Sequence, residues 1–126
     1  MGGLTLDSGA FVAIERGDGR VRAVLAEAFA RDEELTVPGV VVAEVWRGGP
    51  RAAPIARALA ACIVEPVGDA IARKAGEAIA MVRVASAIDA IVMASAASRA
   101  DRVVTSDPKD LGRLRRVFPD VQIVAV

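Results

Sequence analysis

Four acidic residues stand within apolar stretches of this chain, and nearby basic residues are few. An ionised carboxylate that is buried without a partner costs several kcal/mol, unless a cation lies beside it. A bound metal ion is the simplest such cation, so the pattern predicts a metal-dependent enzyme. The four residues are Asp7, Glu44, Asp89 and Asp107.

The chain contains no histidine, which narrows the chemistry further. A serine or cysteine triad that uses histidine, a histidine general base and a zinc site with histidine ligands are all excluded within this chain. Sites built from carboxylate and hydroxyl oxygens favour hard ions. We therefore expect Mg²⁺ or Mn²⁺ as the cofactor.

Length and composition indicate a single domain over residues 1–126. The chain is 54% hydrophobic, but charges interrupt every apolar run, so we expect no transmembrane helix. The first residues lack the features of a secretion signal, which favours a cytoplasmic protein. The single cysteine, Cys62, is expected to be a buried and unreactive thiol, and the surplus apolar surface suggests an interface with a partner.

Short apolar strands alternate with helical patterns along the chain, which predicts an α/β fold with a parallel sheet covered on both faces. The expected strands are residues 3–6, 35–37, 63–64, 102–105 and 121–126. The expected helices are residues 10–15, 20–31, 38–47, 52–61, 69–83, 87–99 and 108–117. We expect the helix at 38–47 to be largely buried, with Pro38 in its first turn.

This layout gives the acidic residues a common location. Asp7 and Asp107 follow the first and fourth strands, and ligands of open α/β sheets bind beyond the carboxyl ends of the strands. If these two strands are neighbours, the two carboxylates converge. Glu44 and Asp89 would approach the same end of the sheet from helices.

Each acid also has a purely structural interpretation. Asp7 and Asp107 could cap helices, and Asp89 stands three residues after Ser86, the spacing of a capping box. Glu44 could pair with Arg47 on a helix surface. For Glu44, apolar residues around the whole helix leave little exposed face for such a pair and favour function. Taken singly, each acid is weak evidence for a site, but the joint placement of the four acids favours a common one.

Four segments together resemble the PIN-domain ribonucleases, in particular the VapC-type toxins of bacterial toxin–antitoxin pairs. The segments are residues 6–10 (LDSGA), 42–48 (VAEVWRG), 87–90 (AIDA) and 104–111 (VTSDPKDL). The resemblance implies a single PIN-like domain with a central parallel sheet of about five strands flanked by helices. It also implies the toxin of a type II pair: an Mg²⁺- or Mn²⁺-dependent endoribonuclease that forms a homodimer and is silenced by a cognate antitoxin.

The resemblance assigns the acidic ligands to Asp7, Glu44, Asp89 and Asp107. Either Asp107 or Asp110 could be the last ligand, and Asp107 is favoured because it directly follows the strand. Supporting hydroxyl groups would come from Ser8, Thr105 and Ser106. Contacts to RNA could come from five arginines, although solvated helix surfaces would explain them equally well: Arg47, Arg51, Arg113, Arg115 and Arg116.

Two other functions remain as alternatives. One is a binding module that has a PIN fold but has lost its catalytic activity. The presence of all four acids argues against it. The other is a metal-dependent phosphatase. The sequence disfavours it, because no second acid stands two residues after Asp7 and no lysine closes a late strand.

Overall fold

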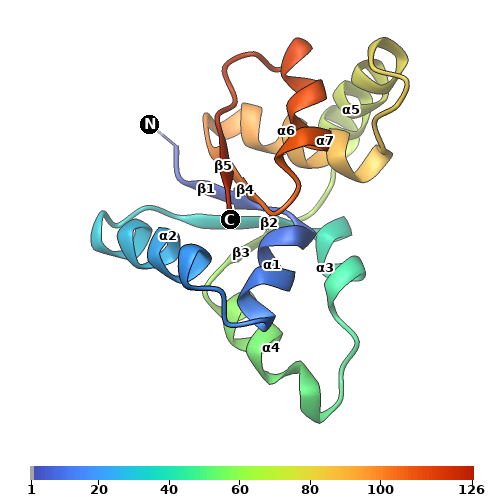
Figure 1. Ribbon diagram of the computed structural model, residues 1–126. Coiled ribbons are helices and arrows are strands. Elements are labelled where there is room, and N and C mark those ends of the chain that lie inside the picture. The colour runs from blue at the N-terminus through green and yellow to red at the C-terminus, as the bar shows by residue number, and fades with distance from the viewer. Residues whose placement is uncertain (1) are drawn as a thin grey trace.

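Five short parallel strands form one sheet in the order β3-β2-β1-β4-β5 (Figure 1). The computed structural model describes residues 2–126. Because every strand is parallel to its neighbours, all carboxyl ends lie at one edge of the sheet. The predicted parallel sheet is confirmed. Its strands are β1 (Leu4–Leu6), β2 (Leu35–Pro38), β3 (Ile63–Glu65), β4 (Arg102–Thr105) and β5 (Ile123–Ala125).

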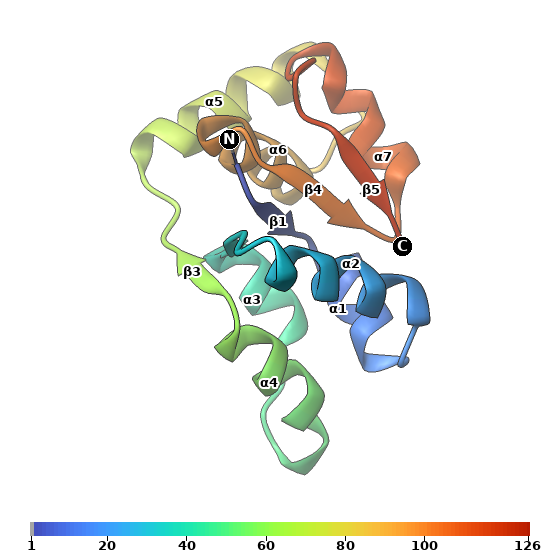
Figure 2. The same ribbon diagram turned by 90° about the vertical axis from the view of Figure 1, so that its left-hand side faces the viewer.

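Helices cover both faces of the sheet, as Figures 1 and 2 show from two directions. On one face lie α1 (Ser8–Glu15), α2 (Gly19–Ala30), α3 (Gly39–Val45) and α4 (Ala53–Ala60). On the other lie α5 (Asp69–Met81), α6 (Ala87–Arg99) and α7 (Pro108–Arg113). Two short 3₁₀ helices, η1 (Pro50–Ala52) and η2 (Leu114–Arg116), complete the fold. No helix within residues 2–126 is long and apolar enough to cross a membrane.

The central strands are buried on both faces, which explains their continuous apolar sequences. The side chains of Leu4, Leu6 and Val104 are fully enclosed, together with Phe11 from α1 and Met93 from α6. Strand β3, at one end of the sheet, is far more exposed. The buried core therefore lies around β1 and β4, the two strands that carry the candidate site.

Three expectations about individual elements were wrong. Pro38 does not lie in a helical turn; it ends β2 with extended angles (φ −64°, ψ 144°) and precedes α3. The helix expected to be largely buried ends at Val45 and buries only Val41, because a single face of this short helix meets the sheet, and Glu44 is exposed. The helix expected at 108–117 ends at Arg113 and continues as η2.

The Cys62 thiol is half-buried and donates a hydrogen bond to the Ala58 carbonyl oxygen. Burial raises the pKa of this thiol to about 11. The thiol is therefore protonated at neutral pH, which agrees with the unreactive cysteine predicted from sequence.

A polar network lies beneath α6 and joins the amino ends of β1 and β4. Asp101 is buried, and its carboxylate accepts hydrogen bonds from the Gly3 N–H (2.7 Å), the Thr5 hydroxyl (2.8 Å) and Arg99 Nε (3.0 Å). Arg99 also pairs with Glu65 at the end of β3. One guanidinium group is thus shared by two carboxylates, one at the end of β3 and one just before β4.

Replacing Arg99 with methionine should leave Glu65 and Asp101 without their counter-charge and lower the free energy of unfolding by about 3 kcal/mol. Urea unfolding at pH 7 measures the change. Arg73→Met is the matched control: it removes an exposed pair with Asp69 and should change stability by less than about 1 kcal/mol. Equal effects of the two substitutions would contradict a structural role for the Arg99 network.

Candidate active site

The ends of β1 and β4 are joined by one hydroxyl group. Because Leu6 pairs with Val104 in the sheet, the next residues, Asp7 and Thr105, lie side by side. The buried Thr105 hydroxyl donates to Asp7 Oδ2 (2.6 Å) and accepts from the Asp107 N–H (2.8 Å). The same hydroxyl therefore positions the first acid and the backbone of the last one.

Asp7 is a helix cap as well as a member of this site. Its Oδ1 accepts the Ala10 N–H (3.0 Å) and so caps α1. Burial raises the pKa of Asp7 to about 6; the hydrogen bonds from Thr105 and Ala10 oppose this increase, and the charge of Asp89 adds to it. The capping interpretation and the site interpretation are thus compatible.

Asp89 is half-buried in the first turn of α6, where its N–H donates to the Ser86 hydroxyl oxygen (3.0 Å). Burial is the main cause that raises the pKa of Asp89, and the Ser86 hydroxyl lowers it. Negative charges on other side chains raise it further, in decreasing order Asp110, Asp107 and Glu44. Asp89 therefore lies in the electrostatic field of carboxylates from α3 and from the start of α7.

The last acid has two candidates, and they are placed differently. Asp107 is exposed at the residue before α7 and its side chain makes no capping hydrogen bond. Asp110, one helical turn later, is half-buried and pairs with Arg113 (3.1 Å). Asp110 acts more strongly on Asp89 than Asp107 does. The sequence favoured Asp107 because it directly follows β4, whereas Asp110 lies one helical turn further along the chain.

The other predicted hydroxyl groups lie next to the contact between Asp7 and Thr105 in the sequence. Ser8 and Ser106 lie beside the Asp7–Thr105 contact, and Gly9 packs so closely on this loop that a Cβ there would lie 2.3 Å from Ser106 Oγ. No local sequence pattern indicates that Gly9 is needed for this close approach.

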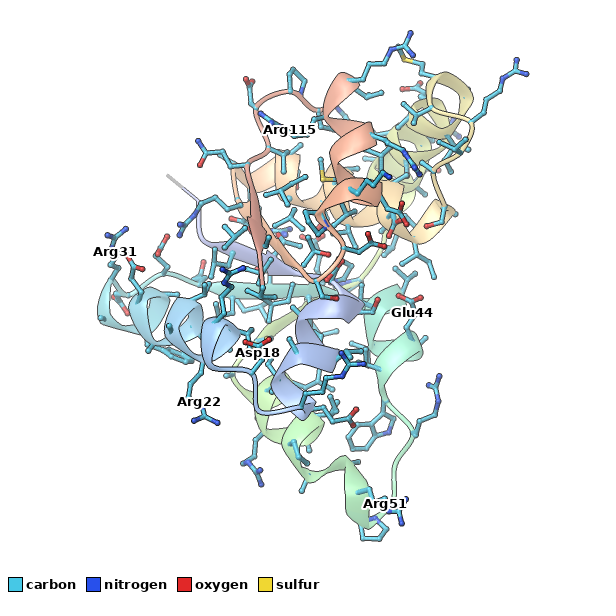
Figure 3. The ribbon with its side chains drawn as sticks, viewed as in Figure 1. Asp18, Arg22, Arg31, Glu44, Arg51 and Arg115 are labelled. Carbon is cyan, nitrogen blue, oxygen red and sulfur yellow. The ribbon has the colours of Figure 1, made fainter. Side chains whose placement is uncertain are left out.

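The arginines predicted to contact RNA lie at different distances from the acids. Arg47 follows α3 and donates to the Ala43 and Trp46 carbonyl oxygens, and Arg113 pairs with Asp110. Figure 3 shows Arg51 and Arg115 at opposite ends of the molecule, with Glu44 between them. Arg116 is exposed on η2. The structure thus pairs Arg113 with one of the acids and holds Arg47 against the end of α3, one turn after Glu44, and it does not bring Arg51 or Arg115 to the acids.

The donor atoms suit a hard divalent ion in type. They are carboxylate and hydroxyl oxygens, and the raised pKa values of Asp7 and Asp89 reflect burial and mutual repulsion that a cation would relieve. Among residues 2–126, no three acidic or cysteine side chains are gathered closely enough to hold an ion as they stand. The side chains of Glu44 and Asp107 are exposed, whereas that of Asp7 is buried.

The sequence matches the PIN domain family over residues 4–117, which is most of the chain. No curated protein matches it significantly. The family match covers the first four strands, β1 to β4, and it includes every acid described above.

Solved structures with similar folds share little sequence with this chain. The VapBC2 complex of Rickettsia felis bound to a promoter DNA fragment contains a chain with 15% identity and a TM-score of 0.79, covering 98% of both chains. DNA-bound VapBC of Salmonella typhimurium gives 15% identity and a TM-score of 0.75, covering 99% of this chain and 98% of that one. FitAcB of Neisseria gonorrhoeae gives 18% identity and a TM-score of 0.64, covering 95% of each chain. At these identities the likeness concerns the fold.

The Asp7 carboxyl should make the metal-free protein less stable as pH rises. Its pKa of about 6 in the folded protein exceeds the ordinary 3.8, so the folded state binds the proton more tightly. The stabilisation is complete below about pH 4 and is lost as pH rises through about 6, a change on the order of 3 kcal/mol. Asp7→Asn should therefore gain stability relative to the wild type between pH 4 and pH 7.

Urea unfolding of the metal-free proteins at these two pH values measures the effect. Asp69→Asn, on the exposed surface of α5, is the control, and its offset from the wild type should change little. A difference in free energy of unfolding between Asp7→Asn and the wild type that is the same at both pH values would contradict a raised pKa for Asp7.

Proposed function

The chain belongs to the PIN domain family, and on this premise we propose that it is a metal-dependent endoribonuclease, the toxin of a type II toxin–antitoxin pair. The observation that carries the proposal is the electrostatic coupling of Asp89 to acids from three other segments, at the edge where Asp7 and Thr105 join β1 to β4. The family resemblance of the four sequence segments supports RNA as the substrate.

Asp7, Glu44, Asp89 and either Asp107 or Asp110 would hold Mg²⁺ or Mn²⁺. When bound, the ion supplies a nucleophilic water at neutral pH and neutralises charge on the scissile phosphate. Thr105 and the Ala10 N–H fix the orientation of the Asp7 carboxylate before the substrate arrives. Such fixed orientation is favourable, because no reorganisation is then needed during the reaction.

Arg47 and Arg113 are suited to contact RNA phosphates on either side of the acids. Both are exposed, and a guanidinium group binds phosphate through two parallel hydrogen bonds. In this role Arg113 would leave its exposed pair with Asp110, which is a weak interaction. The Asp110 carboxylate would then become available to the metal.

The antitoxin is proposed to dock in a cavity of about 300 Å³ between α1, α2 and α4. Ile14, Val21, Leu25 and Phe29 make its wall largely apolar, and Arg22 and Arg57 stand at its margin. This composition suits an amphipathic segment that carries acidic residues beside an apolar face. The similar chains come from complexes named VapBC and FitAB, which supports a partner of this kind.

We further propose a homodimer that acts in the cytoplasm. Met81 and Val84, at the end of α5 and in the connection to α6, have 56% and 72% of their surface exposed. Large apolar side chains exposed together are typical of an interface, and a second copy of the chain would cover them.

Mn²⁺ should raise the Tm of the wild type, because it binds the folded protein and relieves repulsion among the acids. Asp89→Asn should lose this response, since it removes a proposed ligand. Its rate of RNA cleavage should fall by a factor of about 10² or more. Asp69→Asn on α5 should behave as the wild type. Thermal unfolding with millimolar Mn²⁺ and cleavage of a mixed RNA pool, read by gel, measure both effects.

An Asp89→Asn protein that still cleaves RNA in a metal-dependent way would contradict the assignment. A wild-type protein that responds to Mn²⁺ but cleaves no RNA would favour the inactive binding module. No response of either kind would remove the metal site altogether.

Phe29→Asp should weaken binding of the antitoxin about tenfold or more, because it places a charge in the apolar cavity. Co-purification of the cognate pair from cells that express both proteins measures the loss. Ile63→Asp, which replaces a similarly exposed apolar side chain outside the cavity, is the control. Equal retention of the antitoxin by both variants would place its docking site elsewhere.

A further inference from the structure

A second cavity opens at the amino edge of the sheet, opposite the carboxylate site. Its volume is about 610 Å³. It is bordered by residues that precede three neighbouring strands: Gly3 before β1, Glu34 before β2 and Asp101 before β4. Nothing in the proposed ribonuclease mechanism uses this cavity.

Negative charge exceeds positive charge around the cavity, although the whole chain is neutral. Arg31 pairs with Glu27, and Figure 3 shows it directed outward from the end of α2. Arg102 holds Glu33, and Arg99 is shared by Glu65 and Asp101. Asp32 and Glu34 have no ion pair among residues 2–126.

The residues that line the cavity carry four carboxylates (Asp32, Glu33, Glu34 and Asp101) and two guanidinium groups (Arg31 and Arg99), an excess of two negative charges. Asp32 and Glu34 line the cavity and are exposed. A local field of this sign attracts cations and repels anions.

A buried hydroxyl group, that of Thr36, borders the cavity. Thr36 in β2 has only 3% of its surface exposed, and it lines the cavity. Its register partner in β1, Thr5, donates to Asp101. No group among residues 2–126 hydrogen-bonds the Thr36 hydroxyl. Every side-chain nitrogen or oxygen atom that is fully enclosed in this part of the chain does have a partner, so the Thr36 oxygen is not fully enclosed. The Thr36 hydroxyl is therefore open to the cavity, where it can bind a ligand.

We propose that this cavity binds an organic cation with an ammonium or guanidinium group, either a free polyamine or a basic side chain of a peptide. Asp32 and Glu34 would accept hydrogen bonds from the cationic group at the mouth, and the Thr36 hydroxyl would accept one at the base. A divalent metal fits less well, because the cavity is larger than a single ion requires.

Isothermal titration with spermidine, and separately with N-acetyl-arginine amide, tests the proposal and distinguishes the two sources. The titrations are made with excess Mg²⁺, which occupies acidic sites that prefer a hard ion. The double variant Asp32→Asn/Glu34→Gln should bind roughly fivefold to tenfold more weakly, as expected for the loss of two exposed charge contacts. Asparagine suits position 32, where φ is 58°.

Thr36→Val keeps the β-branched shape and should also weaken binding, by loss of the hydroxyl. Glu15→Gln/Glu77→Gln changes the net charge equally on exposed surfaces of α1 and α5 and should leave binding unchanged. Binding of spermidine that the cavity variants weaken supports a free amine; the same result with the arginine amide alone supports a peptide side chain. Absence of binding by both probes, or binding that the cavity variants and the control pair affect equally, would overturn the proposal.

Discussion

The pairing of β1 with β4 is the constraint on which the rest of the site depends. It brings the Thr105 hydroxyl to the Asp7 carboxylate, so that a buried charge receives a hydrogen bond at the point where it leaves the sheet. A charge-assisted bond of this kind is stronger than one between neutral groups. Because Thr105 also accepts the Asp107 N–H, the same contact sets where α7 begins. The position of Asp110, one turn into α7, follows from it.

Buried carboxylates have hydrogen-bonding and charged partners at the amino edge of the sheet, and repelling neighbours at the carboxyl edge. At the amino edge, the Asp101 carboxylate accepts hydrogen bonds from an arginine, a hydroxyl and a backbone N–H, which offset the cost of burying its charge. At the carboxyl edge, Asp7 and Asp89 have raised pKa values, and the acids around Asp89 add repulsion. The carboxyl edge therefore gives up stability that a cation would restore, which is common at functional sites.

The sequence predicted the order of strands and helices and the edge at which the acids lie, because apolar runs and their turn signals are local features. It did not predict that Glu44 would be exposed, since apolar residues around a short helix do not reveal which of them meets the sheet. The effect of Asp110 on Asp89, the close approach of Gly9 to Ser106 and the Arg99 network all join segments distant in sequence. Such contacts require the folded chain, because no local pattern encodes them.

The difficulty of separating helix caps from site residues also has a physical explanation. In a parallel sheet, the helices that follow β1 and β4 begin at the carboxyl edge, and α6, which returns to β4, begins there too. Helix N-termini favour acidic residues, so this architecture gathers carboxylates at one edge whatever the function. Capping therefore does not argue against a site. What marks Asp7 and Asp89 is that burial raises the pKa of both, and that neighbouring acids add to the increase where a cap on the surface would be solvated.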